Sequence, residues 1–441
     1  MLTHLLRPVF AIAQRRLWLA LAIPFLFSGL AWSQEYTVTI LGTLGGTSSL
    51  ALAVNDAGQV VGAANVAGDV HADPFLYSNG KMTDVWTGGT QYGATAIAIG
   101  NNGHFVVNYN LNADGATESF INVGTNWADL GTGGATGMNQ NDTVVGNGPH
   151  GYWVYVDYLL NTSPGYSIPD GGVALAYNIN NDGSIAGECP KADPYYGGQN
   201  GCVFGPNGSY GLQYANLGEA APFPPYVIRA DGTTCGMNGI SQFAEWSENG
   251  TQTVAVSLGG YGECNGLDDY GTAVGIGEPP VGFSAAGYIY DPVNEMRDLN
   301  TLIPNISYQG LPVNVLFANS ISDTGFIAAT CNSNNVGSVA TWACLLTPNW
   351  AVIIRNHIKG LVKGDPHCIP CKTDLYPEAK SLPSHFTDLS TEEKKKATET
   401  VEKIESRLRP LRDDGRISEE VLVLLLHDTE MALRALGHRQ G

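Results

Sequence analysis

Short apolar runs that alternate with polar residues recur along the chain, and each is followed by a turn rich in Asn, Asp and Gly. In the first clear case, Leu50, Leu52 and Val54 alternate before the turn 55–58, and the apolar run 60–61 follows it. Glycine accepts the positive φ that a tight turn requires, and β-branched residues suit a pleated strand. The pattern therefore predicts a β-hairpin.

The same turn recurs at intervals of 39 to 54 residues. The six further turns are 101–103, 139–142, 180–183, 229–232, 267–271 and 322–325. A third apolar strand follows each hairpin, as in Tyr152–Tyr155, and strands that end in Gly-Gly separate several of the units. Four short strands in about 45 residues are typical of a propeller blade. The sequence predicts an all-β fold, a seven-bladed β-propeller over residues 34–349.

The ends of this region suggest how the ring closes. Tyr36–Leu41 is an alternating strand that resembles the last strand of a blade without its first three, and the seventh unit lacks a clear fourth strand. We expect the N-terminal strand to pair with the last blade, which removes the exposed edges of an open sheet. Trp350–Ile354 is the alternative closing strand.

The pattern changes to a helical one after Asn349. Residues 350–389 read as a linker with a Cys-x-x-Cys motif, and residues 390–441 as a small helical hairpin. Ser390 and Glu393 fit a capping box, and Ser418 begins a second helix. The apolar face of this hairpin must be buried. Docking on the propeller, oligomer formation and capture of another protein are all open.

The first 33 residues have the pattern of a secretory signal peptide. Arg15 and Arg16 precede the apolar run 17–27, and small residues stand before Gln34. An N-terminal membrane anchor is the alternative, but the run is short for a spanning helix. No other segment is apolar enough to span a bilayer, so we expect a mature chain without a membrane span, secreted to the extracellular space or to the periplasm.

Charge narrows the classes of partner. Residues 34–349 contain four basic side chains against 26 acidic ones, whereas residues 390–441 contain ten against eleven. A surface this acidic repels phosphate backbones, which argues against nucleic-acid binding. It is compatible with metal ions, neutral sugars or basic partners.

The order of motifs in each unit resembles a known family. Gly-Gly, an Ala-rich strand, Asn-x-x-Gly, Val-Val-Gly and then His-Ala-Phe resemble the bacterial extracellular repeats of the HAF family. The match is fullest in residues 44–89, where His71, Ala72 and Phe75 carry the name-giving residues with two inserted. The resemblance covers residues 36–348 and implies a secreted repeat protein without an established enzymatic activity.

Two pairs of cysteines have matching spacings that predict disulfides in an exported chain. Cys189 and Cys202 occupy the same positions in one unit as Cys331 and Cys344 in another, so each pair should form a bridge within a blade. Cys235 and Cys264 are then left to pair across neighbouring blades. Cys368 and Cys371 are expected to form a short-loop disulfide. A metal site with His367 or His385 and a redox pair are the alternatives.

No catalytic residue is predicted. The chain has no Gly-x-Ser-x-Gly elbow and no His-Glu-x-x-His motif. The Asn and Asp residues of the turns are read as turn formers rather than as calcium ligands, although calcium stays possible. No metal site or other cofactor is predicted.

Loops that join second and third strands are the usual binding loops of propellers, and they supply the candidate ligand-binding residues. These are Asp69, His71, Asp193, Tyr195, Tyr196 and Glu278. Tyrosines with carboxylates suit a sugar or a basic peptide. Three functions follow in order of preference: an extracellular binding or adhesion module for carbohydrate or protein, a polysaccharide-acting propeller enzyme, and a structural component of an envelope or matrix assembly. A central cluster of abnormally titrating carboxylates would favour the enzyme.

Overall fold

The computed structural model describes most of the chain after the N-terminal 33 residues. The described residues are 34–86, 92–111, 116–148, 151–155, 175–190, 199–204, 215–216, 225–238, 240–247, 250–279, 285–333 and 340–439. The predicted signal peptide lies outside them. Within the described residues, no helix has both the length and the apolar content needed to cross a membrane.

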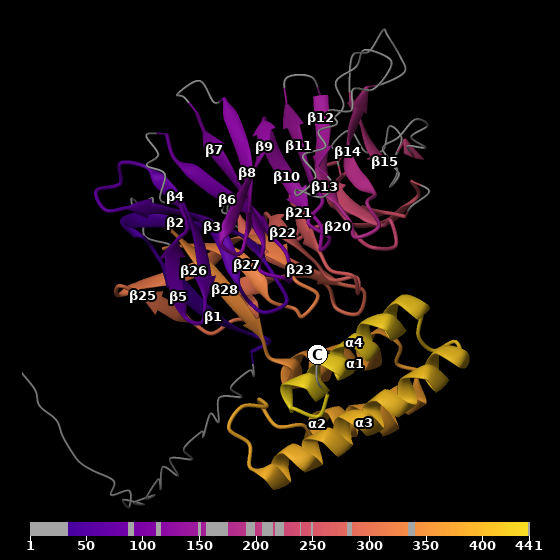
Figure 1. The fold of residues 1–441 in the computed structure, drawn as a ribbon. Coiled ribbons are helices and arrows are strands. Elements are labelled where there is room, and N and C mark those ends of the chain that lie inside the picture. The colour runs from indigo at the N-terminus through magenta and orange to yellow at the C-terminus, as the bar shows by residue number, and fades with distance from the viewer. Residues whose placement is uncertain are drawn as a thin grey trace, which may run out of the picture. The chain divides into compact units, whose positions relative to one another are not determined.

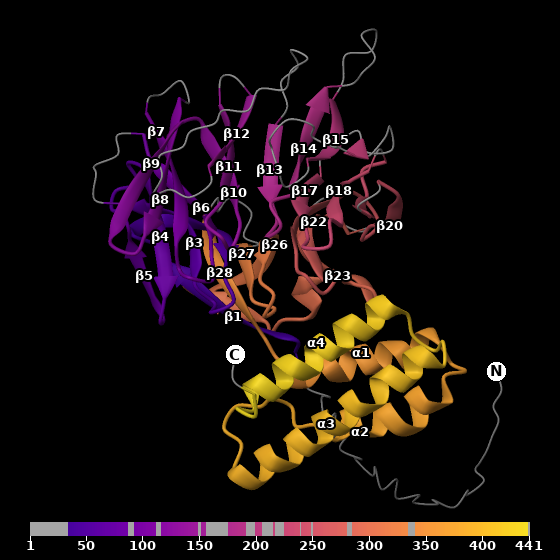
Figure 2. The same cartoon turned by 45° about the vertical axis from the view of Figure 1, so that its right-hand side comes forward.

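The strands form antiparallel sheets, each built mainly from consecutive segments of the chain (Figures 1 and 2). The first sheet contains β2 (Gly45–Val54), β3 (Val60–Val66), β4 (Ala72–Ser78) and β5 (Lys81–Asp84). The second contains β6 (Ala94–Ile99), β7 (Phe105–Asn110), β8 (Thr117–Val123) and β9 (Asn126–Thr132). The third contains β10 (Gly134–Met138), β11 (Val144–Gly148) and β12 (Gly151–Tyr155).

The remaining sheets continue the same order. The fourth contains β13 (Leu175–Ile179), β14 (Ile185–Pro190), β15 (Gln199–Phe204) and β16 (Ala215–Asn216). The fifth contains β17 (Pro225–Ile228), β18 (Thr234–Met237), β19 (Phe243–Trp246) and β20 (Gln252–Val256). The sixth contains β21 (Gly262–Leu267), β22 (Ala273–Gly277), β23 (Ala286–Asp291) and β24 (Glu295–Asp298). The short helix η1 (Leu299–Thr301) follows.

The last sheet joins the two ends of the strand region. It contains β25 (Ile306–Tyr308), β26 (Leu311–Ile321), β27 (Ile327–Ser333) and β28 (Thr341–Pro348), and β1 (Tyr36–Gly42) is its outer strand. β1 pairs with β28 from Tyr36 opposite Pro348 to Gly42 opposite Ala343. The prediction that the N-terminal strand closes the ring is confirmed.

Taken together, the arrangement is all-β and propeller-like. Six sheets have four or five strands, and the third has three within the described residues. The turn between the first and second strands of each sheet contributes to the lining of one cavity, so the sheets surround a common axis. We call the end with these turns the lower face, and the end where second and third strands join the upper face.

Every innermost strand carries a β-bulge at the same place. In β2 the register skips Leu52, and in β13 it skips Tyr177, in each case three residues before the first residue of the turn. The corresponding residues elsewhere are Ile97, Thr136, Tyr226, Asn265 and Asn319. A bulge increases local twist and redirects a side chain. These bulges direct one side chain per sheet away from the regular ladder.

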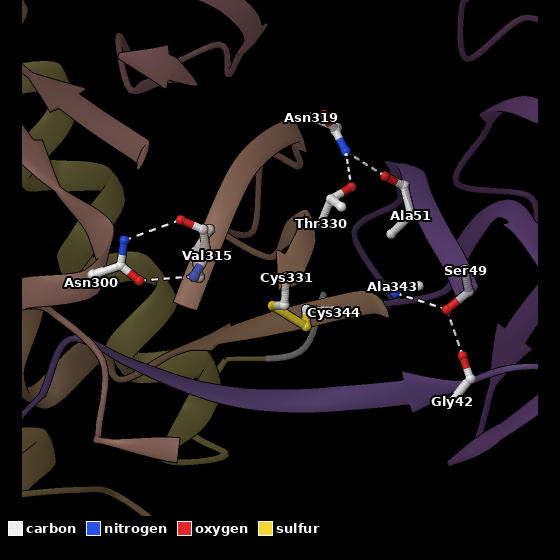
Figure 3. The surroundings of a disulfide bond; sticks show 10 residues. All are labelled: Gly42, Ser49, Ala51, Asn300, Val315, Asn319, Thr330, Cys331, Ala343 and Cys344. Atoms are coloured by element: carbon white, nitrogen blue, oxygen red, sulfur yellow. Dashed lines mark hydrogen bonds between the residues drawn. A yellow bond between two sulfur atoms is a disulfide. The ribbon is translucent and has the colours of Figure 1, made fainter. Parts of the chain in front are cut away.

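Several bulge residues tie their sheet to the next one. Thr136 Oγ1 donates to the Ala176 carbonyl at 2.9 Å, and Asn319 Nδ2 donates to the Ala51 carbonyl at 2.6 Å. The second bond joins the seventh sheet to the first, as Figure 3 shows. Beside it, Ser49 Oγ accepts from the Ala343 N–H at 2.9 Å. Side-chain bonds therefore supplement the pairing of β1 and β28 at the closure.

The glycine of the Val-Val-Gly motif has a packing role in this geometry. Gly62 in β3 lies opposite Ala51, next to the bulge of β2. A Cβ at Gly62 would stand 1.9 Å from the Leu50 carbonyl oxygen, and a Cβ at the equivalent Gly275 would stand 1.9 Å from the Glu263 carbonyl oxygen. The bulge brings the backbones too close for any side chain.

Two of the predicted disulfides lie among the sheets. Cys331 and Cys344 join β27 to β28, with Cα atoms 6.1 Å apart (Figure 3), and Cys235 and Cys264 join β18 to β21 of the neighbouring sheet. Both pairings are confirmed. Cys202 is disulfide-bonded, but the side chain of Cys189 lies outside the described residues, so that pairing stays a prediction.

Replacing both Cys331 and Cys344 by Ala is expected to lower the free energy of unfolding by about 2–3 kcal/mol, because the bridge restrains a loop of intermediate length in the unfolded chain. Denaturant unfolding measures the loss. The matched control is the double replacement of Cys368 and Cys371, whose sequence separation is only 3, against 13 for the first pair. Its loss should be smaller, and equal losses would contradict the loop argument.

The chain after the sheets forms helices joined by short loops: α1 (Trp350–Gly364), the π-helical turn η2 (Cys371–Leu375), α2 (Tyr376–Ser381), α3 (Thr391–Asp413) and α4 (Glu419–Ala435). The capping box of Ser390 and Glu393 and the N-cap at Ser418 are confirmed. The Cys368–Cys371 disulfide is also confirmed. The expectation of a linker over 350–389 is wrong, as is a closing strand at 350–354.

Residues 350–389 are not a linker because they share an apolar core with the helical hairpin. Ala351, Ile354 and Ile358 of α1 follow helical spacing and pack with the buried faces of α3 and α4. Both cysteines and Leu375 belong to the same cluster. The hairpin therefore buries its apolar face against residues 350–386, and we call residues 350–439 the helical unit.

Candidate functional site

The predicted upper-face residues have different surroundings. Asp69 has a positive φ of 53° and accepts hydrogen bonds from the Thr47 N–H at 2.7 Å and from Asn65 Nδ2 at 3.0 Å. These bonds lower the pKa of Asp69. His71 Nε2 lies 3.5 Å from Asp73 Oδ1. Asp69 thus ties its own loop to β2, a local structural role.

The other candidates divide between described and undescribed parts of the chain. Asp193, Tyr195 and Tyr196 lie outside the described residues. Glu278 is exposed just after β22, where its N–H donates to the Tyr261 carbonyl at 2.9 Å. This contact leads to a group of side chains that the sequence reasoning missed.

Three tyrosines and two glutamates from the fourth, fifth and sixth sheets form what we call the tyrosine–glutamate patch. Its members are Tyr177, Glu188, Tyr226, Tyr261 and Glu263. The ring centroids of Tyr177 and Tyr226 are 5.6 Å apart in an edge-to-face arrangement. Tyr177 Oη donates to Glu188 Oε1 at 3.1 Å, and Tyr261 Oη donates to Glu263 Oε2. All five side chains are partly exposed.

Charge interactions also run between members of the patch. Burial raises the pKa of Tyr226, and the negative charges of Glu263 and Glu188 raise it further. Burial likewise raises the pKa of Glu188, although the hydrogen bond from Tyr177 opposes the shift. The charge of Glu278 contributes to the raised pKa of Tyr261. The predicted residue Glu278 therefore borders the patch.

A sequence signal for two of these residues does exist. Tyr177 and Tyr226 both occupy the bulge position, three residues before the turns that begin at Asn180 and Arg229. Superposing the repeats would have placed both tyrosines at equivalent points of adjacent sheets. Attention to loop lengths alone could not reveal them, because they lie on strands.

The lower face carries a ring of turns around a cavity of about 140 Å³. The Asp56 N–H donates to Asn101 Oδ1, the Asn101 N–H to Gln140 Oε1, and the Gln140 N–H to Asn181 Oδ1. The Ala230 N–H donates to Asp269 Oδ1, and the Asp269 N–H to Asp323 Oδ1. Each of these side chains holds the neighbouring turn, so the motif links successive sheets.

Within a turn, the first Asn or Asp holds its own loop. Asn55 Oδ1 accepts from the Ala57 and Gln59 N–H groups, and Asp268 Oδ1 from the Tyr270 and Thr272 N–H groups. These bonds support the reading as turn formers. Among the described residues, no group of three or more His, Cys, Asp and Glu side chains is placed to hold a metal ion.

Carboxylates at the lower face have altered acidity. Burial raises the pKa of Asp268 to about 7. Burial and the nearby charge of Asp269 raise the pKa of Asp323 to about 6. Both groups also accept backbone hydrogen bonds, which limits the shift.

The helical unit contacts the lower face through aromatic and charged side chains. Tyr270 stacks on His427 of α4, with ring centroids 3.6 Å apart, and the indole of Trp350 meets the same histidine edge-on. Burial lowers the pKa of His427 to about 3, so this ring is neutral. The hairpin thus contacts the sheets through α4, although its apolar face is buried mainly against residues 350–386.

A buried charge network lies beside these rings. Arg297 bonds Glu35 and Asp291 at 2.6 Å each. His357 of α1 lies 2.6 Å from Asp428 and 3.4 Å from Asp291. We call these five residues the docking network. It joins the residue before β1, the sixth sheet, α1 and α4.

Comparisons with known proteins find only distant similarities. No family model matches the chain, and no curated protein matches it. Among solved structures, the β-propeller domain of the trilobed protease from Pyrococcus furiosus aligns over 65% of this chain and 92% of its own, with 9% identity and a TM-score of 0.41. The extracellular domain of BT4673 from B. thetaiotaomicron aligns over 70% and 40%, with 11% identity and a TM-score of 0.41.

Dipeptidyl peptidase 4 from Porphyromonas gingivalis aligns over 66% of this chain and 58% of its own, with 11% identity and a TM-score of 0.33. Similarities at this level carry no argument about the fold or the activity of this chain.

Proposed function

We propose that this protein is an extracellular binding module, a seven-bladed propeller of the HAF-repeat type that binds carbohydrate at its upper face. The pattern of residues 1–33 supports export, and the disulfides support an oxidising compartment. The sheets, with the one completed by β1, support the blade count.

The observation that carries the proposal is the tyrosine–glutamate patch. Sugar rings pack their C–H faces on aromatic side chains, and their hydroxyl groups donate to carboxylates. Tyr177 and Tyr226 supply adjacent aromatic rings, and Glu188 and Glu263, which accept from Tyr177 and Tyr261, supply carboxylate oxygens.

The test is glycan-array binding by the purified protein, with and without calcium. We expect saturable binding, weakened about tenfold by Tyr226→Ala because a stacking ring is lost. The matched control is Tyr92→Ala, which removes an exposed tyrosine of the segment between β5 and β6, outside the patch. Absence of binding under both conditions, or equal losses in the two variants, would overturn the proposal. Binding that depends on calcium would favour the Asn and Asp residues of the turns as calcium ligands.

A second function, hydrolysis of an extracellular polysaccharide, is favoured by one observation. Glu188 has a raised pKa within a patch that also contains Glu263, and a general acid with a raised pKa near a second carboxylate is the arrangement used by glycosidases. Release of reducing ends from a bound polysaccharide, abolished by Glu188→Gln, would support it. Binding without release would leave the binding module.

A further inference from the structure

The hydrogen-bond balance of the tyrosine–glutamate patch restricts the chemistry of its ligand. A phenol has one proton, and Tyr177 and Tyr261 donate theirs to Glu188 and Glu263. An ionised carboxylate can only accept. The patch therefore offers aromatic faces and acceptor oxygens, and two of its three phenolic protons are already used.

The charges of the patch also restrict the ligand, because they favour a cation. Glu188, Glu263 and the bordering Glu278 are acidic, and no described Lys or Arg is a member of the patch. The described cations of the sheet region are engaged or lie elsewhere: Arg229 pairs with Asp231, Arg297 with Glu35 and Asp291, and Lys81 begins β5. An anionic ligand would meet acceptors and repulsion here. A cationic ligand would meet carboxylates and ring faces, the two environments that favour an ammonium group.

The order of the sheets that contribute to the patch favours a repeating ligand. The fourth sheet contributes a tyrosine with a glutamate, and the sixth contributes another such pair. Tyr226 belongs to the fifth sheet, which lies between them in the order of the sheets, and the charges of both glutamates raise its pKa. A polymer with one sugar ring and one amino group per unit can contact both tyrosine–glutamate pairs and Tyr226 at once. An isolated basic side chain can contact only one of the two pairs.

From these observations we infer that the ligand is a polymer of sugars with free amino groups, whose ammonium groups lie against Tyr226 and donate to Glu188 and Glu263. This inference rests on the proposed carbohydrate-binding function and names its substrate class.

The experiment compares three oligosaccharides of equal length: a glucosamine oligomer, its N-acetylated form and a glucose oligomer, with a lysine-rich peptide as a fourth probe. Binding is measured by calorimetry at about pH 6.5 in low and high salt. We expect the glucosamine oligomer to bind at least about tenfold more tightly than the two neutral oligomers, and its affinity to fall with salt.

The variant Glu188→Gln/Glu263→Gln keeps the shape of the patch and removes its charge. Its affinity for the glucosamine oligomer should fall at least about tenfold, because charge-assisted hydrogen bonds are lost. The matched control is Glu118→Gln, which neutralises a partly buried glutamate on β8 of the second sheet. Circular dichroism confirms that both variants are folded.

The outcomes separate this inference from the function on which it rests. Equal binding of charged and neutral oligomers, unaffected by the double variant, would overturn the inference and retain the binding module. Binding of the peptide alone would overturn the choice of a glycan. Absence of binding to every glycan here and on the array would overturn both proposals.

Discussion

Arg297→Met is expected to lower the free energy of unfolding by about 3–5 kcal/mol, the loss that follows when one partner of a buried ion pair is removed. Arg297 is the common partner of Glu35 and Asp291, whose side chains are 2% and 1% exposed. Methionine fills similar space but leaves Glu35 without its cation and Asp291 with His357 alone. Because Glu35 precedes the closing strand and Asp291 contacts α1, the loss should affect both ring closure and helix docking.

Denaturant unfolding measures the size of this loss, and hydrogen exchange locates it. Faster exchange is expected in α1 and in β1, which meet at the docking network. The matched control is Arg412→Met, which removes an arginine paired with Asp413 and Glu419 on the exposed surface of the helical unit. Such pairs contribute little, so the control should unfold like the parent. An unchanged midpoint for Arg297→Met would contradict the role assigned to the network.

Local chemistry explains what the sequence could predict. The turn at 55–58 requires Asn and Gly for reasons that lie within a few residues, and the capping box of Ser390 and Glu393 is equally local. The equal spacing of the cysteine pairs also led to Cys331–Cys344, because two strands joined by a short loop must lie side by side. Closure by β1 followed from counting strands.

The features missed depend on register or on distant segments. A shift of one residue in the pairing of β13 with β14 decides where Tyr177 lies. No residue type marks such a bulge, so it can be located only by superposing the repeats. The continuous apolar run 351–354 fits a short strand or a helix, and the shared core with α3 and α4 decides between them. Glu35 and His357 are isolated in the sequence, and their proximity arises only after the ring has closed.

The docking network should give the protein a stability limit at alkaline pH. His357 donates from both ring nitrogens to Asp428 and Asp291, which raises its pKa well above the usual value near 6.5 despite burial. A group with a raised folded-state pKa contributes stability that is complete below its unfolded pKa and is lost as pH rises through the folded value. The other groups facing it are Glu35 and Arg297, which are paired, and His427, which is neutral.

At acid pH, the contribution of Asp291 to stability changes with pH in the opposite direction. Its pKa is held below the ordinary value by His357 and Arg297, so its contribution is present above about pH 4 and is lost below it.

Because the pKa of His357 is raised, the parent protein should lose stability above neutral pH, with faster exchange in α1. The variant His357→Gln should be less stable at pH 7, and its stability should be almost independent of pH on the alkaline side. Midpoints measured from about pH 5 to pH 10 test this. His385→Gln, which replaces an exposed histidine, is the control, and parallel curves for parent and His357→Gln would show that the imidazolium does not hold the helical unit.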